Sequence, residues 1–195
     1  MIELAHPDDL PRIVEIYNST IPSFRVTADL EPVSVESRLE WFATHRTAVE
    51  DPESNPNRPL WVVRKGQSVI GWLSFSDIHD RAAYSRTAEL SLYIAEGFRG
   101  QGVGGRLLDK AIAEAPSLGC VRLLALIFGH NEESLALFTS RGFQRWGFYP
   151  EVAELNGVER DLVVMGIKAN ANANANTNAN ANASTHASPD QARPS

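Results

Sequence analysis

The sequence predicts an α/β fold, with a mixed sheet of about six to seven strands flanked by about four helices. Three observations indicate this class. Segments with strand-like and helix-like spacing of apolar residues alternate along residues 1–168. A glycine-rich segment, GFRGQGVGG at residues 97–105, stands between a predicted strand and a predicted helix. An almost unbroken apolar run, VRLLALIF at residues 121–128, is typical of a strand covered on both faces.

The N-terminal part predicts one short strand and two helices. Residues 2–5 suit the strand, and residues 8–19 have apolar side chains at helical spacing. Ser34 is the predicted N-cap of the second helix. A loop rich in Pro and Asn follows at residues 51–59.

The middle of the chain predicts a hairpin, a further strand and a helix. The hairpin spans residues 60–77, with its turn at residues 65–67. After another loop, residues 87–95 form a strand that leads into the glycine-rich segment. The helix then begins near Val103, where apolar residues return at helical spacing.

The last predicted elements are a strand, a helix and two more strands. The apolar strand at residues 121–128 precedes Asn131, which is the predicted N-cap of a helix that ends near Gly142. Strands around residues 143–149 and 160–167 complete the sheet.

Residues 169–195 differ sharply in composition from the rest of the chain. They hold Ala, Asn and other small or polar residues, and no aromatic or large aliphatic side chain. Such a segment cannot bury enough apolar surface to offset its conformational entropy, so we expect a disordered tail. The 195 residues therefore predict one domain at residues 1–168 followed by this tail, rather than two very small domains.

The composition of the chain indicates which classes of partner and ligand the protein is not expected to bind. The formal net charge is -6, which argues against nucleic acid or an anionic membrane as the main partner. Cys120 is the single cysteine, and the five histidines have no ligand spacing, so we expect no metal. The start of the sequence resembles no secretory signal, and no stretch is long and apolar enough for a membrane span. A cytoplasmic location is the expectation.

The glycine-rich segment predicts a site for a phosphate or pyrophosphate. A helix begins there, and its first backbone N–H groups have no intrahelical acceptor and carry partial positive charge. Glycines let a phosphate approach those groups, and Arg99 can add a charged contact. The alternative is a tight turn whose glycines only allow close helix packing.

Two familiar phosphate-binding patterns fit the segment poorly. Gly100, Gly102 and Gly105 satisfy G-x-G-x-x-G, but the next strand, residues 121–128, has no acidic residue for a dinucleotide ribose. The Walker pattern also fails, because no Gly-Lys-Ser or Gly-Lys-Thr closes the loop.

A third pattern, R-x-x-G-x-G, matches the segment fully. The matching residues are Arg99, Gly100, Gln101, Gly102, Val103 and Gly104. The segment thus resembles the pyrophosphate loop of the GNAT superfamily of acetyl-CoA-dependent N-acetyltransferases. Asn131, Ser134 and the Gly142-Phe143 pair resemble the second coenzyme-binding segment of that superfamily, and the predicted element order is also its order. The resemblance covers about residues 1–168 and implies a sheet whose splayed strands form the acetyl-CoA cleft.

Within the superfamily, the sequence most resembles the phosphinothricin N-acetyltransferase group. The segments that carry the likeness are Ile16-Tyr17-Asn18, Ala83-Tyr84, Thr87-Ala88-Glu89 and Leu92-Tyr93-Ile94. The resemblance implies acetylation of the amino group of a small amino-acid-like compound, such as phosphinothricin or methionine sulfoximine. It also implies a homodimer.

The same resemblance assigns roles to single residues. Glu89 occupies the position of the catalytic general base, whereas strand position alone favours a solvated carboxylate. Leu92, Tyr93 and Ile94 occupy the segment whose backbone contacts the coenzyme and donates to the oxyanion. Arg81 and Tyr84 match positions that are occupied by Arg and Tyr in the phosphinothricin enzymes, and an amino-acid substrate needs a cation near its carboxylate, so we expect these two residues to bind it. The alternative is that Arg81 is a solvated loop residue and Tyr84 packs on the core.

Two departures from the group concern the reaction. Phe138 stands where many GNAT enzymes have a Tyr, and the phosphinothricin enzymes often a His, as the acid for the leaving thiolate. Residues 159–161, Glu-Arg-Asp, stand where the phosphinothricin enzymes often have a Trp-His-Asp or similar triplet near the substrate, so the substrate of this protein can differ. The alternative is that Arg160 and Asp161 form a plain surface ion pair.

Two other functions remain open for this sequence. One is a protein acetyltransferase of the same fold, and the other is a coenzyme A-binding sensor without activity.

We predict that removal of residues 170–195 leaves the melting temperature and the turnover number nearly unchanged, because this segment has no side chains that build a core. Thermal unfolding and steady-state kinetics of the truncated and full chains test this. A large loss of activity would show instead that the tail contributes to the site or to a partner.

Overall fold

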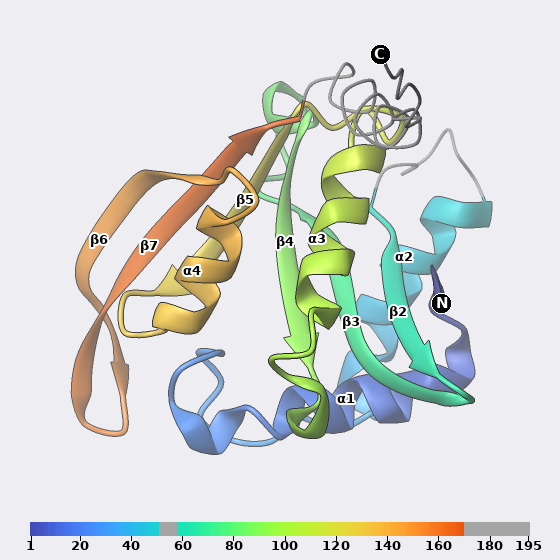
Figure 1. Ribbon diagram of the computed structural model, residues 1–195, viewed down its shortest axis with the longest axis horizontal. Helices are drawn as coiled ribbons and strands as arrows, with labels where there is room; N and C mark the ends of the chain where they lie inside the picture. Colours follow the sequence, from blue (N-terminus) through green and yellow to red (C-terminus); the bar gives the residue numbers. More distant parts are fainter. Residues whose placement is uncertain (51–57, 170–195) are drawn as a thin grey trace, which may run out of the picture.

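The computed structural model describes residues 1–50 and 58–169, with the side chains of residues 46–50 excluded. Its described strands form one seven-stranded sheet in the order β1-β2-β3-β4-β5-β7-β6 (Figure 1). The strands are β1 (Ile2–Leu4), β2 (Leu60–Lys65), β3 (Ser68–Asp77), β4 (Thr87–Ile94), β5 (Arg122–Phe128), β6 (Gln144–Leu155) and β7 (Val158–Lys168). Every neighbouring pair is antiparallel except β4 and β5, which run parallel.

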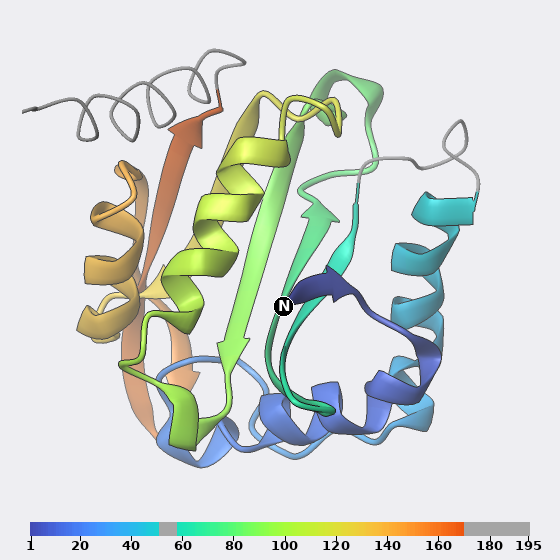
Figure 2. The ribbon, with the colours of Figure 1, turned by 45° about the vertical axis from the view of Figure 1, so that its right-hand side comes forward.

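Four α-helices in the described residues flank the sheet. They are α1 (Leu10–Asn18), α2 (Leu39–Glu50), α3 (Val103–Glu114) and α4 (Glu132–Thr139). Short 3-10 helices lie at Pro7–Asp9, Ile21–Ser23, Glu36–Arg38, Ala82–Tyr84 and Glu96–Phe98. In both ribbon views α3 runs along β4, with α4 beside it over β5 and β7 (Figures 1 and 2). The predicted mixed sheet, helix number and element order are confirmed.

A separate apolar core lies on each face of the sheet. Leu107 and Leu108 of α3 pack with Leu73, Phe75 and Leu123 of the strands, and all five are fully buried. The opposite face of the sheet packs against α1 and α2. The buried residues of this second core include Ile13, Ile16, Phe42, Val62 and Trp72. Alternation along β2 and β3 supplies both cores, because successive strand residues point to opposite faces.

Strand β5 differs from its prediction. The expected cover on both faces is wrong: Leu123, Ala125 and Ile127 are buried, but Leu126 is 43% exposed. The physical reason is that the helices cover only one face of this strand, whereas the other face borders a cleft that Leu126 lines. An apolar run alone does not distinguish a covered face from the wall of a cleft.

The C-terminal hairpin is longer than predicted. Strands β6 and β7 extend to a two-residue turn at Asn156 and Gly157, whose φ angles are 50° and 74°. Positive φ at both positions defines the tight I′ hairpin turn, which favours the Asn-Gly pair. This pair was the signal in the sequence for the additional strand length.

Smaller differences concern the ends of elements. Ser34 is not the N-cap of α2: its hydroxyl accepts a hydrogen bond from the Ser37 N–H at 3.1 Å, within the short helix Glu36–Arg38 that precedes α2 and whose N-cap is Val35. Ala169 is buried, and its N–H donates to the Val121 carbonyl at 3.0 Å, so this residue packs beside β5. Most of the predicted loop at 51–59 and the tail from residue 170 lie outside the described residues.

The parallel strands β4 and β5 separate after three paired residues. Thr87, Ala88 and Glu89 pair with residues 122–124, and no pairing follows. Beyond Glu89, β4 pairs only with β3 and β5 only with β7. The facing edges of β4 and β5 therefore diverge, as the resemblance to the GNAT fold implies.

Candidate active site

The glycine loop turns the chain from β4 into α3 through two left-handed residues. Gly100 has φ 71° and Gly102 has φ 74°, and Gly102 is the N-cap of α3. A Cβ atom added at either position would meet no atom within 4 Å, so both face open space. The first N–H groups of α3 are directed to this side and have no acceptor within the helix. The loop therefore presents a cradle for an anion.

Gly104 has a different role, in packing. A Cβ there would lie 3.0 Å from Cδ2 of Leu137 on α4. This close approach holds the start of α3 against α4. The predicted alternative, glycines that allow close packing, thus applies to Gly104, whereas Gly100 and Gly102 serve the turn and leave its backbone open.

A cleft of about 470 Å³ extends from this loop along the open edge of β4. The predicted coenzyme-binding residues that line it are Leu92, Tyr93, Ile94, Arg99, Gly100, Gly102, Val103, Gly104, Asn131 and Ser134. Gln101 is the exception, because its side-chain amide donates to the Gly97 carbonyl at 2.8 Å and does not line the cleft. The Arg99 side chain is exposed, and its Nε donates to the Ile94 carbonyl at 3.2 Å.

Asn131 fixes the far wall of the cleft. Its Oδ1 accepts a hydrogen bond from the Ser134 N–H at 3.2 Å, which confirms the predicted N-cap of α4. Its Nδ2 donates to the Arg25 carbonyl at 3.1 Å. A buried amide thus joins α4 to the loop after α1, and Val26 of that loop also lines the cleft.

Glu89 lies in a second cavity, of about 420 Å³, that adjoins the first. The two cavities have five lining residues in common: Val26, Leu92, Tyr93, Asn131 and Ser134. Glu89 is the last residue of β4 that pairs with β5, so it stands where the strands begin to separate. Burial raises the pKa of the Glu89 carboxyl above its ordinary value.

Phe138 lines the same cavity as Glu89 and is buried. Its ring meets that of Phe143 edge to face, with 4.9 Å between ring centroids. The position where the family resemblance led us to expect an acid therefore presents an apolar ring with no proton to give.

The two predicted substrate residues lie outside both cavities. Arg81 is the N-cap of the short helix between β3 and β4, Tyr84 is the last residue of that helix, and both are exposed. The Tyr84 ring stacks on His79 at 5.3 Å between centroids, so the alternative that Tyr84 packs on the core is wrong. Both residues precede the end of β4 on which Glu89 stands.

The hairpin β6–β7 closes the Glu89 cavity from the other side, through Val152, Ala153 and Leu162. Asp161 accepts a hydrogen bond from the Glu151 N–H at 2.9 Å. No ion pair joins it to Arg160 in the described part of the chain, so the simple surface pair is wrong.

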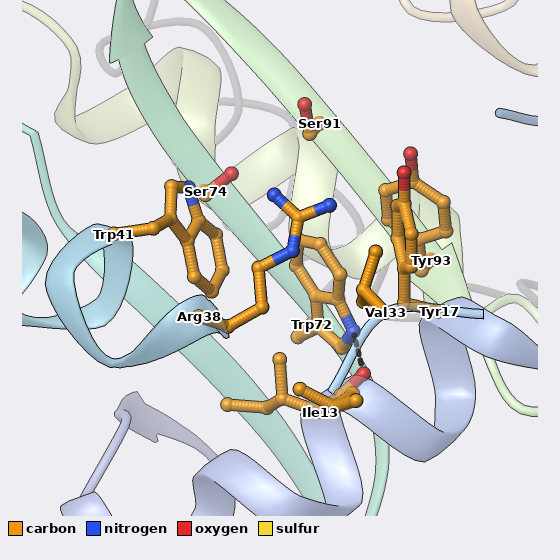
Figure 3. A pocket seen from close by; sticks show the side chains of 10 residues that line it. Ile13, Tyr17, Val33, Arg38, Trp41, Trp72, Ser74, Ser91 and Tyr93 are labelled. Carbon is orange, nitrogen blue, oxygen red and sulfur yellow. Dashed lines mark hydrogen bonds between the residues drawn. The ribbon is translucent and has the colours of Figure 1, made fainter. Parts of the chain in front are cut away.

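Sequence reasoning missed a third cavity, of about 160 Å³, on the face of the sheet covered by α1 and α2 (Figure 3). Arg38, Trp41 and Trp72 are among its lining residues. On sequence, the tryptophans were indistinguishable from ordinary core residues and the arginine from a solvated helix residue. No signal in the sequence placed them around a hollow.

The comparisons with known proteins agree with this geometry. The pattern of the Acetyltransferase (GNAT) family matches residues 13–143. The Bacillus subtilis protein named "Putative phosphinothricin acetyltransferase YwnH" is 46% identical over 85% of this chain and 96% of its own length. An L-methionine sulfoximine/L-methionine sulfone acetyltransferase of Pseudomonas aeruginosa is 29% identical over 80% of this chain and 87% of its own.

A solved structure shares the fold as well. The phosphinothricin acetyltransferase of Sinorhizobium meliloti in complex with AcCoA has a TM-score of 0.78 and 26% identity, covering 87% of this chain and 88% of that one. The chain therefore belongs to the GNAT acetyltransferase family and is an N-acetyltransferase. Members of this family use acetyl-CoA.

Two further observations concern metal binding and membrane-spanning helices. Within residues 1–50 and 58–169, no group of three or more His, Cys, Asp or Glu side chains is arranged to hold a metal ion. None of the helices described there has the length and apolar character needed to cross a membrane.

We predict that Gly102→Val weakens acetyl-CoA binding by roughly tenfold or more, since a β-branched residue in the left-handed region costs about 1–2 kcal/mol and its side chain occupies the open face of the loop. Titration calorimetry measures this. Gly97→Ala is the matched control, because Gly97 has no positive φ and its added Cβ meets no atom. Unchanged affinity in a folded Gly102→Val protein would refute the phosphate assignment.

Proposed function

We propose that the protein transfers an acetyl group from acetyl-CoA to the amino group of a small amino-acid-like compound. The observation that carries this proposal is the adjoining pair of cavities, which leads from the glycine loop to Glu89 at the point where β4 and β5 separate. One end suits a pyrophosphate, and the other has a partly buried carboxyl group suited to proton transfer.

The first cavity suits the coenzyme. The backbone N–H groups at residues 102–104 would hold the pyrophosphate, with Arg99 as a charged neighbour. The open edge of β4 supplies unpaired backbone groups to an extended pantetheine chain, which would add to the sheet as a strand does. Acetyl-CoA supplies the acetyl group as an activated thioester. A backbone N–H among residues 92–94 would stabilise the oxyanion that forms on its carbonyl.

Glu89 acts as the general base in this proposal. A free α-amine is mostly protonated at neutral pH, and only its neutral form attacks a thioester. The raised pKa of Glu89 brings its proton affinity closer to that of the amine than a solvated carboxylate would have. The proton passes from the amine to Glu89, with a water molecule between them.

The leaving thiolate receives no proton from Phe138, whose ring is buried against Phe143. The reaction therefore proceeds through departure of the thiolate itself or through a proton from another group. The buried Phe138 thus distinguishes this chain from GNAT enzymes with an acidic group at the same position.

The relatives support a small substrate. Their names specify phosphinothricin, methionine sulfoximine and methionine sulfone, all of them amino acids with a polar end group. An amino acid brings a carboxylate next to its amine, and Glu89 alone would repel it. Arg81 and Tyr84 line neither cavity, but they stand directly before β4, the strand that carries Glu89. They are the proposed partners of this carboxylate at the rim of the site, because a guanidinium offers two parallel hydrogen bonds and a phenol a third.

We further propose a cytoplasmic homodimer. The outer strand β6 has a row of exposed apolar side chains, namely Trp146, Phe148, Tyr149 and Val152. An apolar edge strand of this length favours association, which removes it from water. Size-exclusion chromatography with light scattering tests the dimer.

Release of coenzyme A, followed with a thiol reagent, separates this function from its rivals. Phosphinothricin, methionine sulfoximine, methionine sulfone and ordinary amino acids form the panel. A protein acetyltransferase would ignore free amino acids, and a sensor would bind the coenzyme without turnover.

We predict that Glu89→Gln lowers turnover at neutral pH by roughly 10²-fold, the scale of a lost general base. In the native enzyme kcat/KM should rise with pH through the raised pKa of Glu89, because only the ionised carboxylate accepts a proton. The defect of the variant should shrink at high pH, where more of the amine is already neutral.

The control for this prediction is Glu40→Gln, an exposed carboxylate on α2 that should leave the pH profile unchanged. An equally large defect of Glu89→Gln at every pH would mean that Glu89 holds structure or substrate and moves no proton.

We also predict that Arg81→Ala raises the KM for the amino acid and leaves the KM for acetyl-CoA nearly unchanged, since the guanidinium would contact only the carboxylate. Arg81→Lys should rescue only partly, because a point charge cannot reproduce the two parallel hydrogen bonds. If the variant weakens the coenzyme alone, or changes nothing, Arg160 is the next residue to test.

A further inference from the structure

The cavity of about 160 Å³ between α1, α2 and the sheet has one charged residue, Arg38, in a wall of aromatic, aliphatic and serine side chains. Its floor is formed by two cross-strand pairs of β3 and β4, Trp72 with Tyr93 and Ser74 with Ser91. Figure 3 shows the guanidinium of Arg38 among the rings of this wall and directed toward the serines. A cation in such surroundings is poorly shielded by water, so it interacts strongly with a group of opposite charge.

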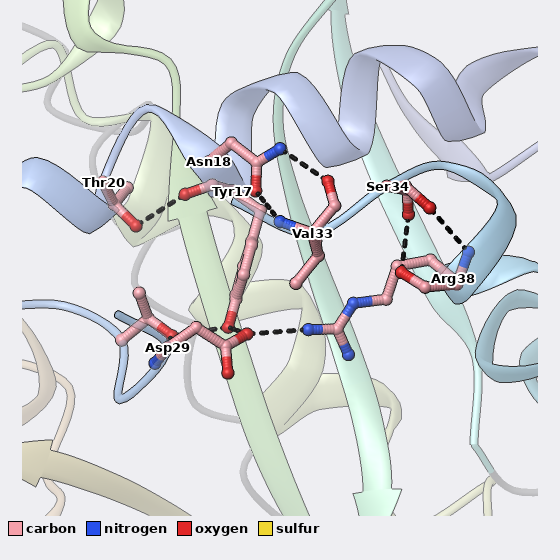
Figure 4. A network of polar contacts seen from close by, with 9 residues as sticks. Tyr17, Asn18, Thr20, Asp29, Val33, Ser34 and Arg38 are labelled. Carbon is pink, nitrogen blue, oxygen red and sulfur yellow. Dashed lines mark hydrogen bonds and ion pairs between the residues drawn. The ribbon is translucent and has the colours of Figure 1, made fainter. Parts of the chain in front are cut away.

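Arg38 is held in place from one side only. Its Nη2 donates to Oδ2 of Asp29 at 2.9 Å, and its guanidinium lies 5.1 Å from the centroid of the Tyr17 ring (Figure 4). Its other nitrogens donate to no group within the described parts of the chain, although the side chain is only 30% exposed. The guanidinium is therefore oriented and retains hydrogen bonds to give.

The same network makes the cavity rigid. Tyr17 donates its hydroxyl proton to Asp29 at 2.5 Å, and Asn18 forms two hydrogen bonds with the backbone of Val33, at 2.8 and 3.0 Å (Figure 4). These contacts join α1 to the segment that leads into α2. Arg38 thus points into a preformed space, and it does not need to be ordered when a ligand arrives.

The cavity borders the proposed acceptor site. Ser91 and Tyr93 line both this cavity and the one that contains Glu89. Glu89, Ser91 and Tyr93 alternate along β4, so their side chains point to the same face. Two residues along a strand span about 7 Å. A compound whose amine lies at Glu89 can therefore place its side chain beside Ser91.

We propose that this cavity receives the side chain of the amino-acid substrate, and that Arg38 selects side chains that end in an anionic oxo group over neutral ones of similar size. The aromatic wall covers the aliphatic stem, and the guanidinium donates to the terminal oxygens. This inference rests on the proposed function, because it assumes an amino acid as the acceptor. It assigns Arg38 the side chain, whereas Arg81 and Tyr84 are proposed for the carboxylate.

The test compares two acceptors that differ in charge at the end of the side chain. Phosphinothricin ends in an anionic phosphinate and L-methionine sulfone in a neutral sulfone. The native full chain should have the higher kcat/KM for phosphinothricin. Arg38→Met should lower that preference at least tenfold, because it removes a charge-assisted hydrogen bond and retains an aliphatic stem. Arg38→Lys should restore part of it.

The ratio of the two kcat/KM values separates selection from structural support. If Arg38 only held Asp29 and the loop in place, its loss would lower both rates alike and leave the ratio unchanged. Arg12→Met is the matched control, because Arg12 on α1 pairs with Glu15 and lines none of the three cavities.

Each outcome decides between the two claims. A native enzyme that prefers the sulfone, or an Arg38→Met variant whose ratio falls by less than tenfold, would overturn the role of Arg38 and leave the proposed function standing. A native enzyme that acetylates no amino acid of the panel would overturn the proposed function and this inference with it.

Discussion

The structure depends on the early end of one strand pairing. Only three residues of β4 pair with β5, and then the strands part. Unpaired backbone N–H and C=O groups are costly when they are buried without a partner, so the parted edges must face water or a ligand that can pair with them. An elongated ligand with amide groups, such as pantetheine, satisfies this requirement. The cleft, the position of Glu89 and the position of the glycine loop all follow from this separation.

Each separated strand is held firmly by its other neighbour. β4 pairs with β3, and β5 with β7, along nearly their whole lengths. At the wide end, Gly104 lets α3 approach Leu137 of α4 and so joins the two halves. On the opposite face, His130 and Asn131 contact the backbone of residues 24–25, at 2.8 and 3.1 Å. The gap between β4 and β5 is thus bounded on both sides by well-packed, hydrogen-bonded segments.

Much of this arrangement could be predicted from the sequence. Apolar patterns, turn residues and helix caps together predicted the strands and α-helices of the described residues, and Asn131 was recognised as a helix cap from its residue type and surroundings. The glycines of the loop indicated a backbone open to an anion, and Gly100 and Gly102 have that conformation. The separation of the strands was predicted only through the family resemblance, since no local pattern encodes where a pairing ends.

What the sequence could not predict depends on packing between distant segments. Leu126 belongs to an apolar run, yet it borders a cleft, because none of the helices that the structure describes covers that face of β5. Arg38 ends the short helix Glu36–Arg38, yet its side chain points into a cavity formed by α1, α2 and two strands. Residue type gave no indication of either position. Both became apparent only when four segments were placed together in space.

Hydrogen exchange of the full chain, with and without acetyl-CoA, tests the central claim most directly. If the coenzyme fills the gap between β4 and β5, amides of residues 92–94 that face the gap should exchange more slowly when it binds. The amides of the first turn of α3 should be protected as well, since they would contact the pyrophosphate. Binding of the coenzyme without added protection in either segment would contradict the account.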